Sequence, residues 1–377
     1  MKRIIAAIIL LLSCTEYLSV PHHTKAQKLT VDRLLWKFNA SHTTYLAAAD
    51  SVIYAASPTG CTDYVPCGPP ARLFALDEKS GKQKWMIENV GGDSAPVIAD
   101  GRVYQSGGAS LFAINAQTGQ VEWKLKPGAN GTVMHSPVIA KGMIFFWEVQ
   151  ALIPAGFFGG TLHAVDLKTR EQKWKFSISG GMVSAPVTDD GLIYVGSTGG
   201  SLVPEKGRLY ALDARTGSVR WKFGVAGSSL TADGGIVYYA GTDGFLYALD
   251  ARKGRKLWKI KSVQGFYSTD LVNGLVYLVV PGQKLQAVDS KTGQPKWEFK
   301  TDREVYSSPI VSSGVVYVGS IDGGLYALDA KSGHELWSFK MGNAMVSSPL
   351  VADGAVYVAS HDGYIYAIKS LNRVVLS

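Results

Sequence analysis

Short runs of alternating apolar and polar residues recur along this chain in nearly the same words. Residues 208–221 read RLYALDARTGSVRW, residues 245–258 read FLYALDARKGRKLW and residues 324–337 read GLYALDAKSGHELW. Period-two alternation over five or six residues is typical of β-strands. Between the runs, the Asp can accept backbone N–H bonds and the Gly can take a positive φ. Each copy therefore predicts two strands joined by a tight turn.

One complete unit, residues 306–339, contains four such runs. We expect its inner strand at residues 307–311, the second at 315–318, the third at 324–329 and the outer strand at 335–339. In Leu-Tyr-Ala-Leu-Asp, we expect the two leucines on one face and the Tyr and Ala on the other, so that both faces pack against neighbouring sheets. The Trp of the outer strand is expected to be a structural plate between sheets.

Eight of the nine tryptophans set the register of the repeat, with gaps of 49, 38, 51, 47, 37, 39 and 40 residues. A period near 40 residues with four strands per unit is typical of a β-propeller blade. The tryptophans that we assign to this structural role are Trp36, Trp85, Trp123, Trp174, Trp221, Trp258, Trp297 and Trp337.

The number of repeats predicts an all-β, eight-bladed propeller of four-stranded antiparallel blades. The second and third strands occur together eight times, but the outer strands are displaced. The first outer strand, at residues 35–38, has no blade before it, and the last blade has no Trp after it. We therefore expect the N-terminal strand to complete the last blade, which closes the ring without a free edge. The propeller is assigned to residues 35–377 as a single domain.

The pattern Ala-x-Asp-x-x-x-Gly-x-x-x-Trp resembles the repeat of the pyrroloquinoline-quinone-like propellers. It is intact at residues 75–85, 211–221, 248–258, 287–297 and 327–337. Asn115 replaces the Asp in the second copy, and Arg170 replaces the Gly in the third. The resemblance covers the chain from Trp36 to Ile368 and implies the propeller fold.

The same resemblance implies one of two function classes. The first, which this chain most resembles, is the scaffold lipoprotein of the outer-membrane β-barrel assembly machinery, BamB. The second is the quinoprotein dehydrogenases, which hold the quinone and calcium over the propeller axis and typically carry two adjacent cysteines. No two cysteines are adjacent in this chain. We therefore expect a non-enzymatic protein without a cofactor, with a dehydrogenase that uses the quinone and calcium as the alternative.

The N-terminus predicts an exported protein. Lys2 and Arg3 precede an apolar run over residues 4–12, which is shorter than the roughly 20 residues that span a bilayer. Leu-Leu-Ser-Cys, ending at Cys14, resembles a lipobox. We predict a lipoprotein signal peptide at residues 1–13, a lipid anchor on Cys14 and a polar tether at 14–34. Cleavage after Ala26, with simple secretion, is the alternative.

The predicted location is the periplasm or cell surface, with anchoring to the outer membrane. If Cys14 carries lipid, Cys61 and Cys67 remain as a pair that closes a short loop, and an exported protein favours a disulfide there. A metal site is the alternative, but it needs further ligands. The net charge of +8 comes from scattered basic residues without a long run of like charge, which argues against a nucleic-acid partner.

Irregular residues at the inner strands are candidates for lining the axial channel. Most inner strands begin with Ser or Thr before Pro, whereas one Asp, one Glu, one His and two Tyr depart from this pattern. A hard cation such as calcium takes about six to eight oxygen ligands, so this set predicts no metal site. The candidate channel residues are His135, Tyr267, Asp270, Glu304 and Tyr306.

Connections between the second and third strands are short in five blades and long in the first, third and fourth, at residues 58–70, 147–160 and 197–207. Apolar loops on a rigid frame are typical of a protein-binding face, although they also fit a lid over the channel. We expect a monomeric propeller that binds an envelope protein or extended peptide. The candidate contact residues are Tyr64, Val65, Leu152, Ile153, Phe157, Phe158, Leu202 and Val203.

Overall fold

The computed structural model describes fourteen segments of the chain: residues 33–40, 45–58, 70–92, 94–128, 131–152, 157–179, 181–199, 207–227, 229–261, 269–272, 274–280, 283–305, 307–345 and 347–370. All regular structure in these segments is β. None of the described residues belongs to a helix long and apolar enough to cross a membrane.

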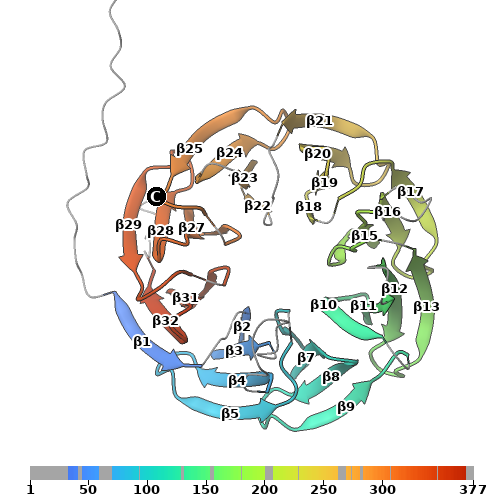
Figure 1. Cartoon of the computed structure of the whole chain (residues 1–377), viewed down its shortest axis with the longest axis horizontal. Helices are drawn as coiled ribbons and strands as arrows, with labels where there is room; N and C mark the ends of the chain where they lie inside the picture. Colours follow the sequence, from blue (N-terminus) through green and yellow to red (C-terminus); the bar gives the residue numbers. More distant parts are fainter. Residues whose placement is uncertain are drawn as a thin grey trace, which may run out of the picture.

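The described strands form eight four-stranded antiparallel sheets that stand as blades around a ring (Figure 1). This arrangement confirms the predicted eight-bladed propeller. Within each blade the first strand lies innermost and the fourth outermost (Figure 1). Blades 1 to 4 consist of β2 (Tyr45–Ala49), β3 (Val52–Ser57), β4 (Arg72–Asp77) and β5 (Gln83–Glu88); β6 (Val97–Ala99), β7 (Arg102–Gly107), β8 (Ser110–Asn115) and β9 (Val121–Leu125); β10 (Thr132–Ala140), β11 (Met143–Leu152), β12 (Phe157–Asp166) and β13 (Gln172–Ile178); β14 (Val187–Asp189), β15 (Leu192–Gly196), β16 (Leu209–Asp213) and β17 (Val219–Phe223).

The second half of the ring repeats this plan. Blades 5 to 8 consist of β18 (Ser229–Asp233), β19 (Ile236–Ala240), β20 (Phe245–Asp250) and β21 (Lys256–Lys261); β22 (Thr269–Val272), β23 (Leu275–Val280), β24 (Lys284–Asp289) and β25 (Pro295–Lys300); β26 (Ile310–Ser312), β27 (Val315–Gly319), β28 (Gly324–Asp329) and β29 (Glu335–Lys340); β30 (Leu350–Ala352), β31 (Ala355–Ala359), β32 (Tyr364–Lys369) and β1 (Leu34–Asn39).

The N-terminal strand closes the ring, as predicted. Strand β1 pairs antiparallel with β32 and places Trp36 opposite Ala367. The Trp36 indole N–H then donates to the Glu78 carbonyl at 2.8 Å, which joins blade 8 to blade 1. Because the last blade takes its fourth strand from the start of the chain, the two ends of the propeller are tied together without an open sheet edge.

The turn between the third and fourth strands works as the repeat predicts. In blade 7, Asp329 Oδ1 accepts the N–H groups of Lys331 and Ser332 at 3.1 and 2.9 Å. Gly333 has a φ of 73°, and a Cβ added there would lie 2.6 Å from the Trp297 ring of blade 6. This glycine is therefore required by its backbone conformation and by the tryptophan of the preceding blade.

The predicted faces of the third strand are wrong. In blade 7, Leu325 and Ala327 pack in one cluster with side chains of blade 8. Leu328 packs in another cluster with side chains of blade 6, and Tyr326 lies against that cluster. The two leucines are three positions apart, so strand alternation must place them on opposite faces. Each face therefore carries one leucine and one other apolar side chain.

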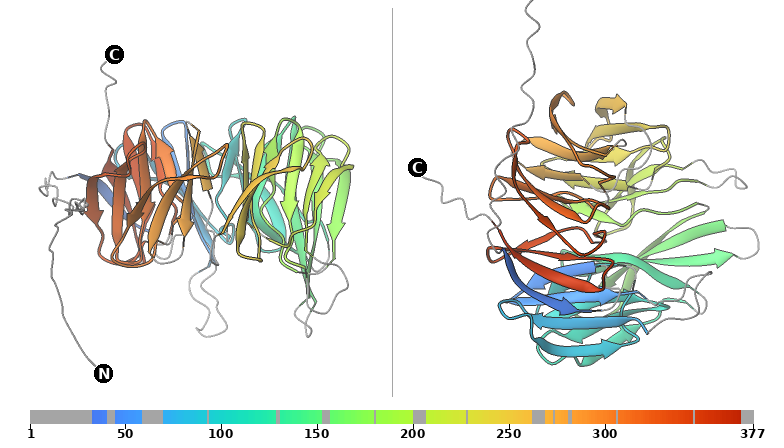
Figure 2. Two further views of the ribbon diagram at one scale, coloured as in Figure 1. Left: turned by 90° about the horizontal axis from the view of Figure 1, so that it is seen from above. Right: turned by 60° about the vertical axis from the view of Figure 1, so that its left-hand side comes forward.

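The third blade also differs from the prediction. A connection was expected over residues 147–160, but β11 and β12 are ten residues each and pair as far as Leu152 and Phe157. Only residues 153–156 lie between the two strands. Trp147 is fully buried among side chains of blades 3 and 4, because alternation turns it into that interface. The hairpin projects beyond the rest of the ring in Figure 2.

Candidate functional site

The connections between second and third strands leave all blades on one face of the ring, and they differ in kind. Blades 5, 7 and 8 use the same short turn, which we call the Asp-Gly turn, at residues 241–244, 320–323 and 360–363. In each turn the N–H of the last residue donates to the carbonyl of the first, at 3.2, 3.0 and 3.0 Å. These three blades thus present closed, compact tips.

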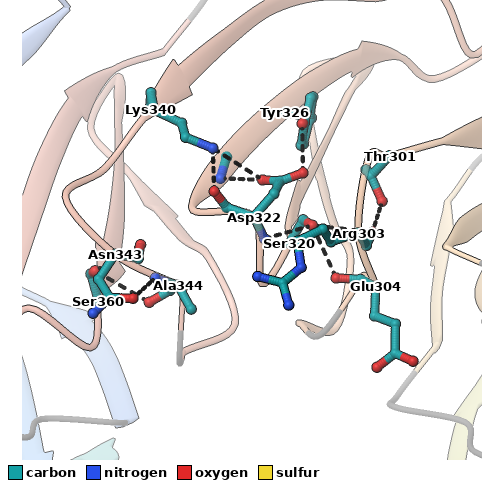
Figure 3. Close-up of polar contacts among 11 residues, drawn as sticks. Thr301, Arg303, Glu304, Ser320, Asp322, Tyr326, Lys340, Asn343, Ala344 and Ser360 are labelled. Carbon is teal, nitrogen blue, oxygen red and sulfur yellow. Dashed lines mark hydrogen bonds and ion pairs between the residues drawn. The ribbon is translucent and has the colours of Figure 1, made fainter.

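Asp322 shows how an Asp-Gly turn is fixed (Figure 3). Its carboxylate accepts the Tyr326 hydroxyl at 2.9 Å and the Gly324 N–H at 2.6 Å, and its side chain is only 7 % exposed. Lys340 Nζ lies 3.9 Å from the same carboxylate and also donates to the Asp322 carbonyl. Burial, and next the hydrogen bond to Asp322, raise the pKa of the Tyr326 hydroxyl. Both carboxylate oxygens of Asp322 therefore accept a hydrogen bond that fixes the turn.

The same Tyr–Asp pair recurs in the other two Asp-Gly turns. Tyr247 donates to Asp243 and Tyr366 donates to Asp362, both at 2.5 Å. Burial first, and then the carboxylate partner, raise the pKa of each hydroxyl to about 12. Hydrogen bonds to a charged acceptor are among the stronger ones in proteins. The three turns are therefore built as one recurring, rigid device.

Two serines tie these turns to the incoming chain (Figure 3). Ser320 Oγ donates to the Glu304 carbonyl at 3.0 Å, and the Ile321 N–H donates to the same oxygen at 3.0 Å. In blade 8, Ser360 Oγ donates to the Ala344 carbonyl at 3.2 Å. The connection that enters each blade is thereby attached to the tip of that blade.

Blade 3 replaces the Tyr–Asp pair with a buried histidine and glutamate. His163 occupies the Tyr position of the repeat, and its Nε2 lies 3.0 Å from Glu148 Oε2, a contact that is ionic when the imidazole is protonated. Its Nδ1 lies 2.7 Å from Gln172 Oε1, and its ring stacks on Phe146 at 5.3 Å. His163 and Glu148 are 5 % and 6 % exposed. The carboxylate comes from β11, so this pair crosses two strands.

The base of the blade 3 hairpin is packed on both faces. A Cβ at Gly128 or Gly131, in the connection that enters blade 3, would lie 2.0 or 2.2 Å from Glu148 Oε1. On the opposite face, a Cβ at Gly160 would lie 2.9 Å from the Trp147 ring. Because only glycine leaves enough room at these positions, the chain passes in direct contact with both side chains. The hairpin therefore projects from a fixed base.

The predicted contact residues lie only in part within the described residues. Leu152 is opposite Phe157, and Ala151 is opposite Phe158, at the far end of the hairpin. Backbone pairing thus brings Leu152, Phe157 and Phe158 together at this end of the hairpin. The structure does not describe their side chains. The remaining candidates, and all three cysteines, lie outside the described residues: Tyr64, Val65, Ile153, Leu202, Val203, Cys14, Cys61 and Cys67.

The predicted channel residues do not form one cluster in the described part of the chain. His135 has a φ of 64° at a register shift of β10, and burial lowers its pKa, opposed by a hydrogen bond with the Val183 backbone. Glu304 is exposed and precedes blade 7, across the ring from blade 3 (Figure 1). Asp270 lies in β22, opposite Tyr277, with its side chain outside the description. Tyr267 and Tyr306 lie outside the described residues.

A calcium ion for the quinone would need several oxygen ligands close together. Among the described residues, no group of three or more His, Cys, Asp or Glu side chains could hold a metal ion. The described side chains therefore do not supply such a ligand set.

The sequence analysis did not predict two polar features of this face, which are the Asp-Gly turns with their Tyr–Asp pairs and the buried Glu148–His163 pair. The Asp-Gly turns have a local signal, Asp-Gly-x-x-Tyr, at residues 243–247, 322–326 and 362–366. The Glu148–His163 pair has only a weak signal, which is a His where six of the other copies carry Tyr or Phe and blade 6 carries Gln286. Its carboxylate partner follows only from the register of β11 against β12.

Comparison with known protein families identifies the family of this chain. Residues 26–151, 205–310 and 301–376 match the family model described as outer membrane protein assembly factor BamB. The matches cover most of the chain. It belongs to the BamB family. This confirms the resemblance inferred from the repeat, and a family named for outer-membrane assembly suggests a protein of the cell envelope. No curated protein matches the chain.

Solved structures share the fold at low sequence identity. The computationally designed protein Ika8 is 15 % identical with a TM-score of 0.72, and the match covers 89 % of this chain and 98 % of that one. BamB from Moraxella catarrhalis is 17 % identical with a TM-score of 0.67, covering 89 % and 99 %. Quinohemoprotein alcohol dehydrogenase from Comamonas testosteroni is 17 % identical with a TM-score of 0.70, covering 89 % and 76 %. The fold is thus common to BamB and to dehydrogenases, and by itself it fits either class.

Proposed function

We propose that the protein is a non-catalytic scaffold propeller of the cell envelope, exported and held at the membrane by a lipid on Cys14. Its partner is a protein or extended peptide, which binds on the face that carries the β11–β12 hairpin. The observation that carries this proposal is the hairpin itself. It projects from a fixed base, whereas the tips of blades 5, 7 and 8 are closed by their own Tyr–Asp pairs.

The far end of the hairpin has the backbone of a peptide-binding edge. Strand β10 pairs with β11 only as far as Val149, and β13 pairs with β12 only as far as Gly160. Beyond these residues, at 150–152 and 157–159, the described strands pair only with each other. An unpaired strand edge offers N–H and C=O groups that an added strand can satisfy. This favours a partner that contributes an extended segment.

The test begins with tagged full-length protein purified from gently solubilised membranes, with its companions identified by mass spectrometry. A second sample carries Phe157→Asp and Phe158→Asp. A control carries Ile321→Asp, which adds one negative charge to the Asp-Gly turn of blade 7, against two on the hairpin. We expect a specific companion in the wild type and the control, and its loss from the hairpin variant. Equal recovery of the companion from all three samples would place binding elsewhere.

Two further measurements separate the parts of this proposal. Cys14→Ser is expected to move the protein from the membrane fraction to the soluble periplasmic fraction, and its retention in the membrane would contradict the lipid anchor. The non-catalytic assignment predicts no dye reduction by the purified protein with pyrroloquinoline quinone, calcium and an alcohol or sugar. Saturable turnover that needs both the quinone and calcium would favour a dehydrogenase instead.

A further inference from the structure

The junction between blades 2 and 3 breaks a rule that six other junctions obey. In those six, a glycine of the turn between third and fourth strands contacts the Trp of the preceding blade, and an added Cβ would lie 2.5–2.8 Å from that ring. At the junction of blades 2 and 3, Arg170 stands in place of the glycine, with a φ of 62°. Its N–H still donates to the Asp166 carbonyl at 2.8 Å, so the turn keeps its shape. A side chain therefore occupies the space that faces Trp123.

Two interblade hydrogen bonds are missing at this junction. Between blades 4 and 5, Tyr194 and Trp221 both donate to the Ala251 carbonyl, at 3.1 and 2.9 Å. Among the described residues, neither Tyr104 nor Trp123 makes the equivalent bond to blade 3. A pocket of about 440 Å³ opens there instead. The junction whose turn lacks the glycine therefore also lacks both of these hydrogen bonds, and a pocket lies there.

The other residue that differs from the repeat, Asn115, contacts a residue that lines the same pocket. Asn115 stands where the repeat has Asp, and its amide donates to Glu122 at 3.3 Å. Glu122 occupies a position where blades 1, 4 and 6 carry a cation that pairs with the repeat Asp. Arg102 donates to Glu122 at 2.6 Å and lowers the pKa of its carboxyl. Both irregular copies of the repeat therefore place unusual charged groups on the wall of one pocket.

The charges of the wall indicate the class of ligand. The wall carries three cations and two carboxylates. Arg102 is paired with Glu122, and Arg170 lies close enough to that carboxyl to help lower its pKa. Between blades 4 and 5, Arg252 and Asp190 bridge the corresponding gap at 2.6 Å, but no ion pair joins Lys168 to Asp100 among the described residues. Lys168 and Arg170 are exposed and form no ion pair among the described residues, so the excess positive charge of the wall is available to an anion. The ring of Trp123, half-buried, adds an apolar surface beside them.

We propose that this pocket binds a small anionic sugar, one that carries a carboxylate or a phosphate. Arg170 and Lys168 bind the anionic group, the sugar ring lies against Trp123, and Asp100 and Glu122 accept its hydroxyl groups. The volume falls within the roughly 300–1,000 Å³ of typical small-molecule sites. Guanidinium groups suit carboxylate and phosphate because they donate two parallel hydrogen bonds. The pocket lies at the opposite end of the blades from the β11–β12 hairpin tip, since β11 begins beside it at Met143.

Titration calorimetry on the full-length protein tests the proposal with four probes: glucuronate, glucose 6-phosphate, glucose and inorganic phosphate. We expect at least one of the charged sugars to bind saturably, and glucose and phosphate to bind at least about tenfold more weakly, a difference of about 1.4 kcal/mol. The stronger of the two charged sugars shows whether a carboxylate or a phosphate is preferred. Absence of saturable binding by both charged sugars would overturn the proposal.

The decisive variant is Arg170→Gly, which restores the repeat and is expected to fold at least as well as the wild type. It should weaken the charged sugar at least about tenfold, or about 1.4 kcal/mol, with an equal or higher Tm. Lys253→Gly removes one positive charge from the equivalent turn of blade 5 and is the matched control, with unchanged binding. Unchanged affinity in Arg170→Gly, or equal weakening in both variants, would show that this pocket is not the site. Neither variant touches the hairpin, so the outcome is independent of the partner experiment.

Discussion

Blades 7 and 3 are built from the same repeat but end differently on the same face of the ring. Blade 7 closes its tip in four residues and fixes it with the Tyr326–Asp322 pair. Blade 3 continues both strands to ten residues, and its polar pair, His163 and Glu148, lies at the base of the hairpin. One polar pair therefore completes a tip, and the other supports an extension.

The two blades differ in where the carboxylate of the polar pair comes from. In blade 7 the carboxylate lies four residues before the Tyr, so the pair and the turn are one local unit. In blade 3 the carboxylate comes from the neighbouring strand. The pair therefore does not depend on a short turn, and both strands can continue past it. The change costs nothing in burial, since both carboxylates remain nearly covered. Asymmetry on this face thus arises without disturbing the ring.

The largest effect is expected for the apolar side of the hairpin base. Trp147→Ala empties a fully buried site between blades 3 and 4 and should lower the free energy of unfolding by about 3–5 kcal/mol. Trp85→Ala, at a half-buried site of the regular repeat, should cost less. Urea unfolding followed by tyrosine fluorescence or circular dichroism measures both. An equal loss in the two variants would show that Trp147 contributes no more to stability than a tryptophan of the regular repeat.

The next effect concerns the buried polar pair of blade 3. His163→Phe leaves the buried Glu148 carboxyl without its hydrogen-bond partner, so we expect a loss of at least about 1–3 kcal/mol. The double variant Glu148→Leu with His163→Phe should recover most of that loss, because the unpartnered carboxyl is then replaced by an apolar side chain. A double-mutant cycle in urea gives the coupling energy. Additive single effects would contradict the pairing.

A smaller effect is expected for the closed tip of blade 7. Asp322→Ala leaves the Tyr326 hydroxyl and the Gly324 N–H without their acceptor and should cost about 1–3 kcal/mol. Tyr326→Phe removes only one donor and should cost about 0.5–1.5 kcal/mol. Because Asp362 belongs to another blade, combining Asp322→Ala with Asp362→Ala should give a nearly additive loss. Strong coupling would show that the tips act together.

The smallest effect lies at an exposed turn and depends on pH. Hydrogen bonding to Arg220, above all, lowers the pKa of Asp213 to about 2. A carboxyl whose pKa is lower in the folded state adds stability above its unfolded pKa of about 3.9, and this stability is lost as the pH falls towards 2. Arg220→Ala should therefore be slightly less stable at pH 6, with the difference shrinking between about pH 4 and pH 2. A difference that is constant with pH would exclude this linkage.

The sequence by itself determined the architecture. The alternation, the Asp-x-x-x-Gly turn and the Trp period are local signals, and each is satisfied within one copy or by the next copy along the chain. Counting copies then gave eight blades, and the displaced outer strand gave the closure between β1 and β32. Such features are predictable because strand period and turn chemistry depend on neighbours in sequence.

Tertiary structure decided the rest, because the relevant neighbours are distant in sequence or set by register. Pro154, Gly156 and the two later glycines made the end of blade 3 resemble a loop, but pairing with β12 kept β11 extended to Leu152. The contact of Glu148 with His163 follows from strand register, and one residue of slip would turn each side chain to the other face. Arg170 was visible as an exception to the repeat. Only the packing of blade 2 against blade 3 showed that Trp123 is the residue that it faces and that a pocket lies between them.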